Sequence, residues 1–182
     1  FSAMAFVQPK YLQRSERNTY REFNRYHMGG NAVYRASGAY APDVKGTFSL
    51  GTDVAYQDGT ILFYNLSATQ ERGTTLTDNK KEGANNFGLF ANEDLQMGDR
   101  WTLGVGARWD AVTYTYSSNI TPASNMTKGF SGVTPKVGLT YRLSPAHSWY
   151  ASFGGGIEVP AGNETDPEAG TPNAVYAINP LL

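Results

Sequence analysis

The chain has 182 residues, enough for one domain or part of a larger one, and its 15 Lys and Arg against 16 Asp and Glu leave a net charge of -1. This balance argues against a nucleic-acid binder, which needs a basic surplus, and the absence of Cys excludes a disulfide framework or a thiol nucleophile. The low charged fraction, 20 Gly and 13% aromatic content favour a β protein.

Alternating polarity recurs along the chain and predicts strands with one apolar and one polar face. It is strictest where Trp101, Leu103, Val105, Ala107 and Trp109 alternate with small, polar or charged residues. Seven strands are expected in chain order, the second and fourth of them weaker: Ser2–Val7, Arg25–Ala36, residues 45–57, Asn86–Gln96, Trp101–Asp110, Val133–Ser144 and residues 148–157.

The expected connections alternate between long and short. Residues 8–19, 58–85 and 117–132 and everything after Glu158 are expected to be long loops, whereas 37–44, 97–100 and 145–147 are short turns. Short turns at one end and long loops at the other are typical of an outer-membrane β-barrel. The fold class is therefore expected to be all-β, an antiparallel up-and-down transmembrane β-barrel segment.

The aromatic residues of the apolar face fit the dimensions of a lipid band. Trp101 and Trp109 are about 27 Å apart along a strand at ~3.3 Å per residue. With strand tilt, this gives roughly 20 Å of height beside a lipid band of ~25 Å. We therefore expect these residues to face lipid or form its aromatic girdles: Trp101, Leu103, Val105, Trp109, Tyr141 and Trp149. The alternative is that the Trp residues belong to the core of a soluble β-sandwich.

Three features fit this pattern poorly. Glu93 falls in the apolar phase and is tolerable only near a turn, and Pro135 in the same phase cannot donate to a ladder. Beyond Asp110 the apolar residues move to the even positions, as in Val112 and Tyr114, which predicts a bulge or emergence from the bilayer.

Motifs for catalysis or cofactor binding are weak. Gly104-Val-Gly106 and Gly154-Gly-Gly156 lack the context of a phosphate or dinucleotide loop. His27 and His147 lack metal-ligand spacing, and the acidic residues around Glu164 form a solvated loop more simply than a Ca²⁺ site. We therefore expect no enzyme activity, no catalytic residues, no cofactor and no bound metal.

Several segments resemble the TonB-dependent outer-membrane receptors. The segments that carry this resemblance are residues 86–95, 101–110, 134–141, 149–160 and 178–182, the last ending Ile-Asn-Pro-Leu-Leu. The resemblance implies a 22-stranded barrel with an N-terminal plug that contacts TonB. About seven strands would then come from residues 1–182 as a partial barrel domain, with the plug, signal peptide and remaining strands outside it.

The same resemblance implies function and location. Receptors of this kind lie in the bacterial outer membrane, in contact with its lipid, and take up a scarce nutrient, most often an iron–siderophore complex. TonB would act through the plug. The alternatives are a complete eight-stranded outer-membrane barrel acting as an anchor or adhesin, and a soluble lipocalin-like carrier of a small ligand.

Polar residues of the strands are expected to face the barrel lumen. The candidates are Asp53, Arg108, Asp110, Lys136 and Arg142. A symmetric hairpin around 117–132 would bring Asp110 near Lys136 and leave Arg108 and Arg142 without an acidic partner on that hairpin. Such cations would attract an anionic ligand or pair with carboxylates of the plug.

Aromatic residues of the long loops suit capture of a small-molecule ligand, in particular a metal chelate, by stacking and burial. They could equally be belt residues or anchors for loop packing. With the cation above, the candidate ligand-binding residues are Phe63, Tyr64, Arg108, Tyr114, Tyr116 and Phe130.

Overall fold

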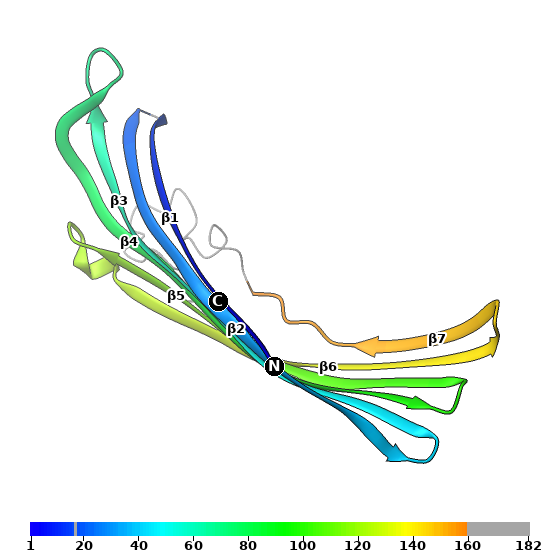
Figure 1. The fold of residues 1–182 in the computed structure, drawn as a ribbon. Helices are drawn as coiled ribbons and strands as arrows, with labels where there is room; N and C mark the ends of the chain where they lie inside the picture. Colours follow the sequence, from blue (N-terminus) through cyan, green and yellow to red (C-terminus); the bar gives the residue numbers. More distant parts are fainter. Residues whose placement is uncertain (17, 160–182) are drawn as a thin grey trace.

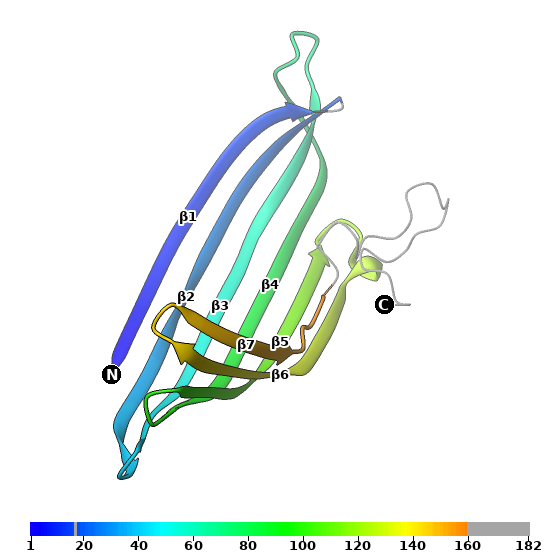
Figure 2. The ribbon, with the colours of Figure 1, turned by 90° about the vertical axis from the view of Figure 1, so that its right-hand side faces the viewer.

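The computed structural model describes residues 1–16 and 18–159 as one curved sheet of seven antiparallel strands (Figures 1 and 2). The strands run in the order of the sequence, each paired with its neighbours, as an up-and-down meander. Their bounds are Ser2–Glu16 (β1), Thr19–Ala41 (β2), Val44–Leu66 (β3), Arg72–Met97 (β4), Trp101–Ser118 (β5), Met126–Ser144 (β6) and His147–Gly154 (β7).

The expected number, order and direction of the strands are confirmed, but three of the expected long loops are wrong. The fourth, after Glu158, lies almost wholly outside the described residues. Most of residues 8–19, 58–85 and 117–132 extend the strands on either side, and the connections shrink to 17–18, 67–71 and 119–125. The last of these contains the short 3-10 helix Pro122–Ser124 (η1). Polar residues occupy both faces of the extensions, so the alternation that marks a strand is absent from their sequence although the backbone pairing continues.

The opposite end of the sheet has tight turns, as expected. Residues 42–43, 98–100 and 145–146 join the strands there, and Gly98 adopts a φ of 57°, which few other residues adopt at low cost. At the loop end, β3 and β4 rise beyond their neighbours (Figure 2). Among the described residues, no helix has the length and hydropathy that a membrane crossing requires.

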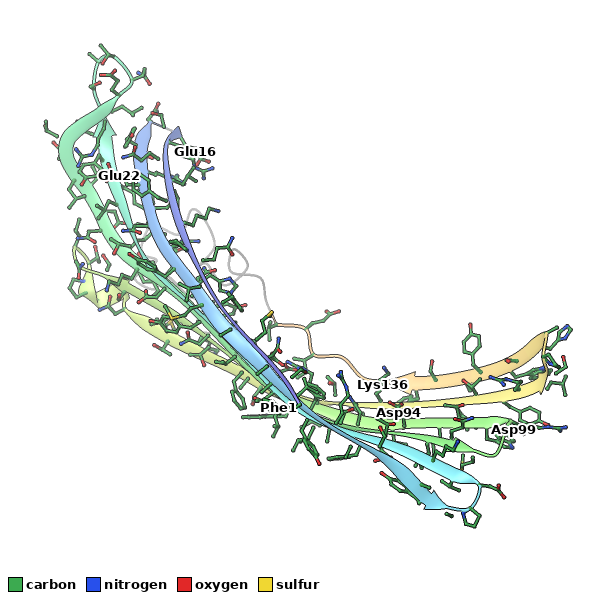
Figure 3. The ribbon with its side chains drawn as sticks, in the orientation of Figure 1. Phe1, Glu16, Glu22, Asp94, Asp99 and Lys136 are labelled. Atoms are coloured by element: carbon green, nitrogen blue, oxygen red, sulfur yellow. The ribbon has the colours of Figure 1, made fainter. Side chains whose placement is uncertain are left out.

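The sheet has one apolar and one polar face. Large apolar side chains such as Val54, Leu89, Val105 and Trp109 are exposed, whereas Ile61 is the one large hydrophobic side chain of the described residues that is fully buried. The sheet is bent, and Figure 3 shows Lys136 and Glu16, two members of the polar face, on its concave side. Most large apolar side chains therefore lie exposed on the convex face of the sheet and do not form an enclosed core.

Of the two explanations for the change of pattern after Asp110, a bulge or emergence from the bilayer, the bulge is wrong. Strand β5 pairs with β4 in an unbroken register from Trp101 opposite Met97 to Ser118 opposite Lys80. Since side chains alternate strictly along such a strand, Val112, Tyr114 and Tyr116 lie on the same concave face as Asp110. The change along β5 is one of composition, because the concave face becomes aromatic toward the loop end.

Candidate binding surface

The convex face carries paired aromatic residues at two levels. Near the tight turns, the rings of Trp101 and Tyr141 lie 4.4 Å apart between centroids, and Tyr141 is in register with Trp149. Eight residues along β5, Trp109 contacts Phe87 edge to face at 5.8 Å. Leu103 and Val105 lie between these levels on the same face. This is the arrangement of a membrane-spanning sheet with two aromatic girdles.

Glu93, the acidic residue of the apolar phase, lies beside an aromatic partner. It is in register with Phe48 on β3, and the ring of Tyr40 on β2 lies beside its carboxylate. A side chain at Gly46 would collide with both the Tyr40 ring and the Glu93 carboxylate, so this glycine makes room for their contact. The carboxylate therefore lies near the turns, covered by a phenol ring.

On the concave face, Arg108 of β5 binds two carboxylates. Its Nη1 and Nη2 donate to Asp53 Oδ2 and Oδ1 at 2.7 and 2.9 Å, and its Nε donates to Asp110 at 2.8 Å. Asp53 belongs to β3, two strands away, and Gly88 of β4 lies between them in register with both Asp53 and Asp110. The guanidinium crosses β4 at the position where a side chain is missing.

A second ion pair crosses a strand in the same way, nearer the loop end. Arg25 of β2 donates from Nη2 to Glu82 Oε2 of β4 at 2.8 Å, and Gly59 of β3 lies beneath the arginine side chain. Glu82 also accepts from Lys80 Nζ at 2.8 Å. Each arrangement fixes three strands by one charged contact, which restricts how these strands can slide past one another.

The expected charge pairing across the β5–β6 hairpin is wrong. Asp110 is opposite Gly132 and Lys136 is opposite Gly106, because the hairpin closes at 119–125 and not midway through 117–132. Arg108 has two acidic partners, whereas neither Lys136 nor Arg142 makes an ion pair with another residue of the described ranges. The cations predicted for the lumen that remain without an ion pair among the described residues are thus Lys136 and Arg142 of β6.

The structure brings most of the predicted aromatic residues together. Phe63 and Tyr116 each lie 5.3 Å from Lys80 Nζ, measured to the ring centroid, on the concave face. Tyr114 and Phe130 contact one another edge to face at 6.1 Å. Tyr64 instead lies on the convex face, where Arg72 stacks on its ring at 3.8 Å. Phe63 and Tyr116 are thus joined through Lys80, and Tyr114 and Phe130 form a second pair on the same concave face, whereas Tyr64 lies apart.

Tyr116 lies seven residues beyond Trp109, toward the loops and outside the band between the two aromatic levels. Burial raises its pKa above the ordinary value. The phenol is consequently neutral at physiological pH and keeps a proton with which it can donate a hydrogen bond.

Sequence reasoning missed the basic residues next to this surface. Arg14 and Lys10 lie in a segment expected to be a loop, and Arg21 lies at the edge of that loop, yet all three belong to the β1–β2 hairpin and face the concave side. Lys10, Arg14 and Glu16 all fall on even positions, but apolar and polar residues do not alternate around them, so no clear signal of a strand was present in the sequence. No cluster of three or more potential metal ligands occurs in the part of the chain that the structure describes, and Glu164, Asp166 and Glu168 lie outside it.

Comparison with known proteins agrees with this architecture. Residues 4–182 match the family described as TonB dependent receptor-like, beta-barrel. The fold resembles the crystal structure of the ferric citrate transporter FecA in the unliganded form, with a TM-score of 0.65 and 15% sequence identity. The match covers 84% of this chain and 23% of the FecA chain. No curated protein matches the chain at a significant level.

The fold is that of a membrane-spanning antiparallel barrel segment. The chain belongs to the TonB-dependent receptor β-barrel family, whose members are bacterial outer-membrane receptors and transporters, and this places it in the outer membrane. The two alternatives, a complete eight-stranded barrel and a lipocalin-like carrier, lose support because the chain matches the TonB-dependent receptor family over residues 4–182.

Proposed function

We propose that the chain forms part of the barrel wall of a receptor that takes up a scarce nutrient. The nutrient that the observations support best is an iron–siderophore complex. The convex face with Val105 and the two aromatic levels would contact lipid, and the concave face with Arg108 and Lys136 would line the lumen. The observation that carries this proposal is the aromatic surface with Phe63 and Tyr116 at the loop end of the concave face, which can bury a planar chelate. The ferric citrate transporter FecA, of similar fold, has a chelate of iron as its substrate.

The wall would be completed by strands beyond those described here. Strands β1 and β7 have unpaired edges, and an open sheet edge is costly in lipid. We propose that these seven strands pair on both sides with further strands of a 22-stranded barrel. TonB would act through a plug domain outside residues 1–182. No bond of the ligand would be made or broken, so the proposed role is transport and not catalysis.

Growth of a strain that lacks its other ferric receptors tests this function. The full-length receptor is expected to restore growth on a ferric chelate under iron limitation. Replacing both Phe63 and Tyr116 with Ala should abolish this growth at low chelate concentration while the barrel remains folded in the membrane. Wild-type growth of the double variant across all chelate concentrations would contradict the proposed binding surface.

A further inference from the structure

Two cross-strand pairs of the β1–β2 hairpin oppose like charges on the concave face. Arg14 is in register with Arg21, and Lys10 is in register with Arg25. Like charges directly opposite one another destabilise an antiparallel pair. Arg25 contributes to the wall through its ion pair with Glu82, but wall stability does not explain why Lys10 lies opposite it or why Arg14 lies opposite Arg21.

The acidic residues nearby do not neutralise this charge. Glu16 is shared between Arg14, at 2.6 Å, and Arg21, at 3.3 Å. Glu82 is shared in the same way between Arg25 and Lys80. Asp78 of β4, in register with Phe63, adds a third carboxylate to the same face. Three carboxylates therefore oppose five cations, and the face as a whole keeps an excess positive charge. Lys10, the fifth of these cations, makes no ion pair with any other residue in the described ranges.

Aromatic rings lie between these cations. The guanidinium carbons of Arg14 and Arg25 lie 5.7 Å and 5.4 Å from the ring centroid of Phe23. Phe63 has Arg21 at 5.0 Å and Lys80 at 5.3 Å. The Arg14 side chain is 48% exposed and that of Arg25 27%, so the surface is open to a molecule that enters from the loop end.

We propose that this surface binds a polyanionic ferric chelate with planar donor groups. We call it the basic aromatic patch, formed by Lys10, Arg14, Arg21, Arg25, Phe63 and Lys80. The inference rests on the proposed function and adds the charge class of the substrate. A concave surface with excess charge of one sign concentrates ions of the opposite sign and speeds their capture. A neutral chelate gains only stacking and burial there.

Two adjacent lysines of β4 supply a matched comparison. Lys80 faces the patch, and Lys81 is on the opposite face, in register with Thr60 and Ser117. The test uses the full-length receptor in detergent, with Lys10→Gln and Lys80→Gln combined in one variant and Lys81→Gln as the control. Retention of the heat-modifiable gel mobility of a folded barrel would verify that both proteins are folded.

The measurement is the dissociation constant of two probes at low and high salt, a trianionic ferric tricatecholate and a neutral ferric trihydroxamate. We expect the double variant to bind the trianionic probe about tenfold more weakly at low ionic strength, with a smaller difference at high salt. The Lys81→Gln variant should bind it as the wild type does.

The outcomes separate this inference from the proposed function. If the wild type binds the neutral probe as tightly as the trianionic one, or if the double variant equals the Lys81→Gln control, the charge preference is overturned while the receptor function stands. If the wild type binds neither probe and restores no growth on any ferric chelate, the proposed function itself fails. Salt-dependent loss confined to the double variant supports the inference.

Discussion

The guanidinium of Arg108 and the carboxylate of Asp53 form a two-bond ion pair although strand β4 lies between their strands. The pair exists because Gly88 leaves the surface of β4 bare at the crossing. A charged contact of this kind is geometrically well defined, since Nη1 donates to Oδ2 and Nη2 donates to Oδ1 in two parallel bonds. It connects three neighbouring strands on the concave face.

We expect the stability effects of Gly88→Val and Arg108→Gln to be non-additive. A valine at position 88 would displace the guanidinium, whereas the shorter glutamine no longer occupies that space. The coupling free energy should be about 1 kcal/mol, within the range of contacting residues. Denaturant unfolding of the full-length receptor in lipid vesicles, for the two single variants and the double variant, measures it.

Gly138→Val is the matched control for this cycle. It introduces the same side chain on the polar face of β6, where a Cβ atom meets nothing within 4 Å. Its effect on unfolding should be small and should add to that of Arg108→Gln. If Gly88→Val behaves in the same additive way, the crossing over Gly88 has no energetic role.

Val105→Arg should destabilise the full-length barrel by roughly 2–4 kcal/mol, the cost of a cation near the middle of the lipid band. Val105 lies on the convex face between Trp101 and Trp109, and its side chain is exposed. Gly104→Arg places the same charge at nearly the same depth on the concave face, opposite Asp94, and should cost much less. Equal losses in equilibrium unfolding would remove the distinction between the faces.

Residues 1–182 expressed alone should aggregate in buffer or require detergent. The described sheet has two unpaired edges and a convex face covered with apolar side chains, which water does not stabilise. Size-exclusion chromatography with and without detergent checks this. A monodisperse monomer in buffer that melts cooperatively would argue against a membrane barrel segment.

The sequence allowed the fold to be predicted wherever one face is apolar. Strict alternation from Trp101 to Trp109 identified both the strand and its faces, because only an extended backbone places alternate side chains on opposite faces. The same reasoning failed in residues 8–19 and 58–85. Polar side chains on both faces there hide the continuation of the strands toward the loop end. Pairing within the sheet, and not side-chain pattern, maintains those extensions.

The charged contacts were harder to predict than the strands. Arg108 was expected to lack an acidic partner on its own hairpin, but Asp110 is two residues away on the same strand and Asp53 lies 55 positions earlier in the chain. No pattern within one hairpin reveals a partner two strands away, because that contact depends on the register of β3, β4 and β5 and on a glycine in the middle strand. The basic aromatic patch was missed for a related reason, since its residues come from four strands.

The central claim is that the convex face contacts lipid and the concave face lines the lumen. Spin labels at two adjacent residues of β6 test it most directly. Val137 lies on the convex face, in register with Val105, and Lys136 lies on the concave face. In the full-length receptor in bilayers, a label at 137 should be accessible to oxygen and shielded from a water-soluble relaxation agent, and a label at 136 should show the reverse. Equal accessibility at the two positions would contradict the account.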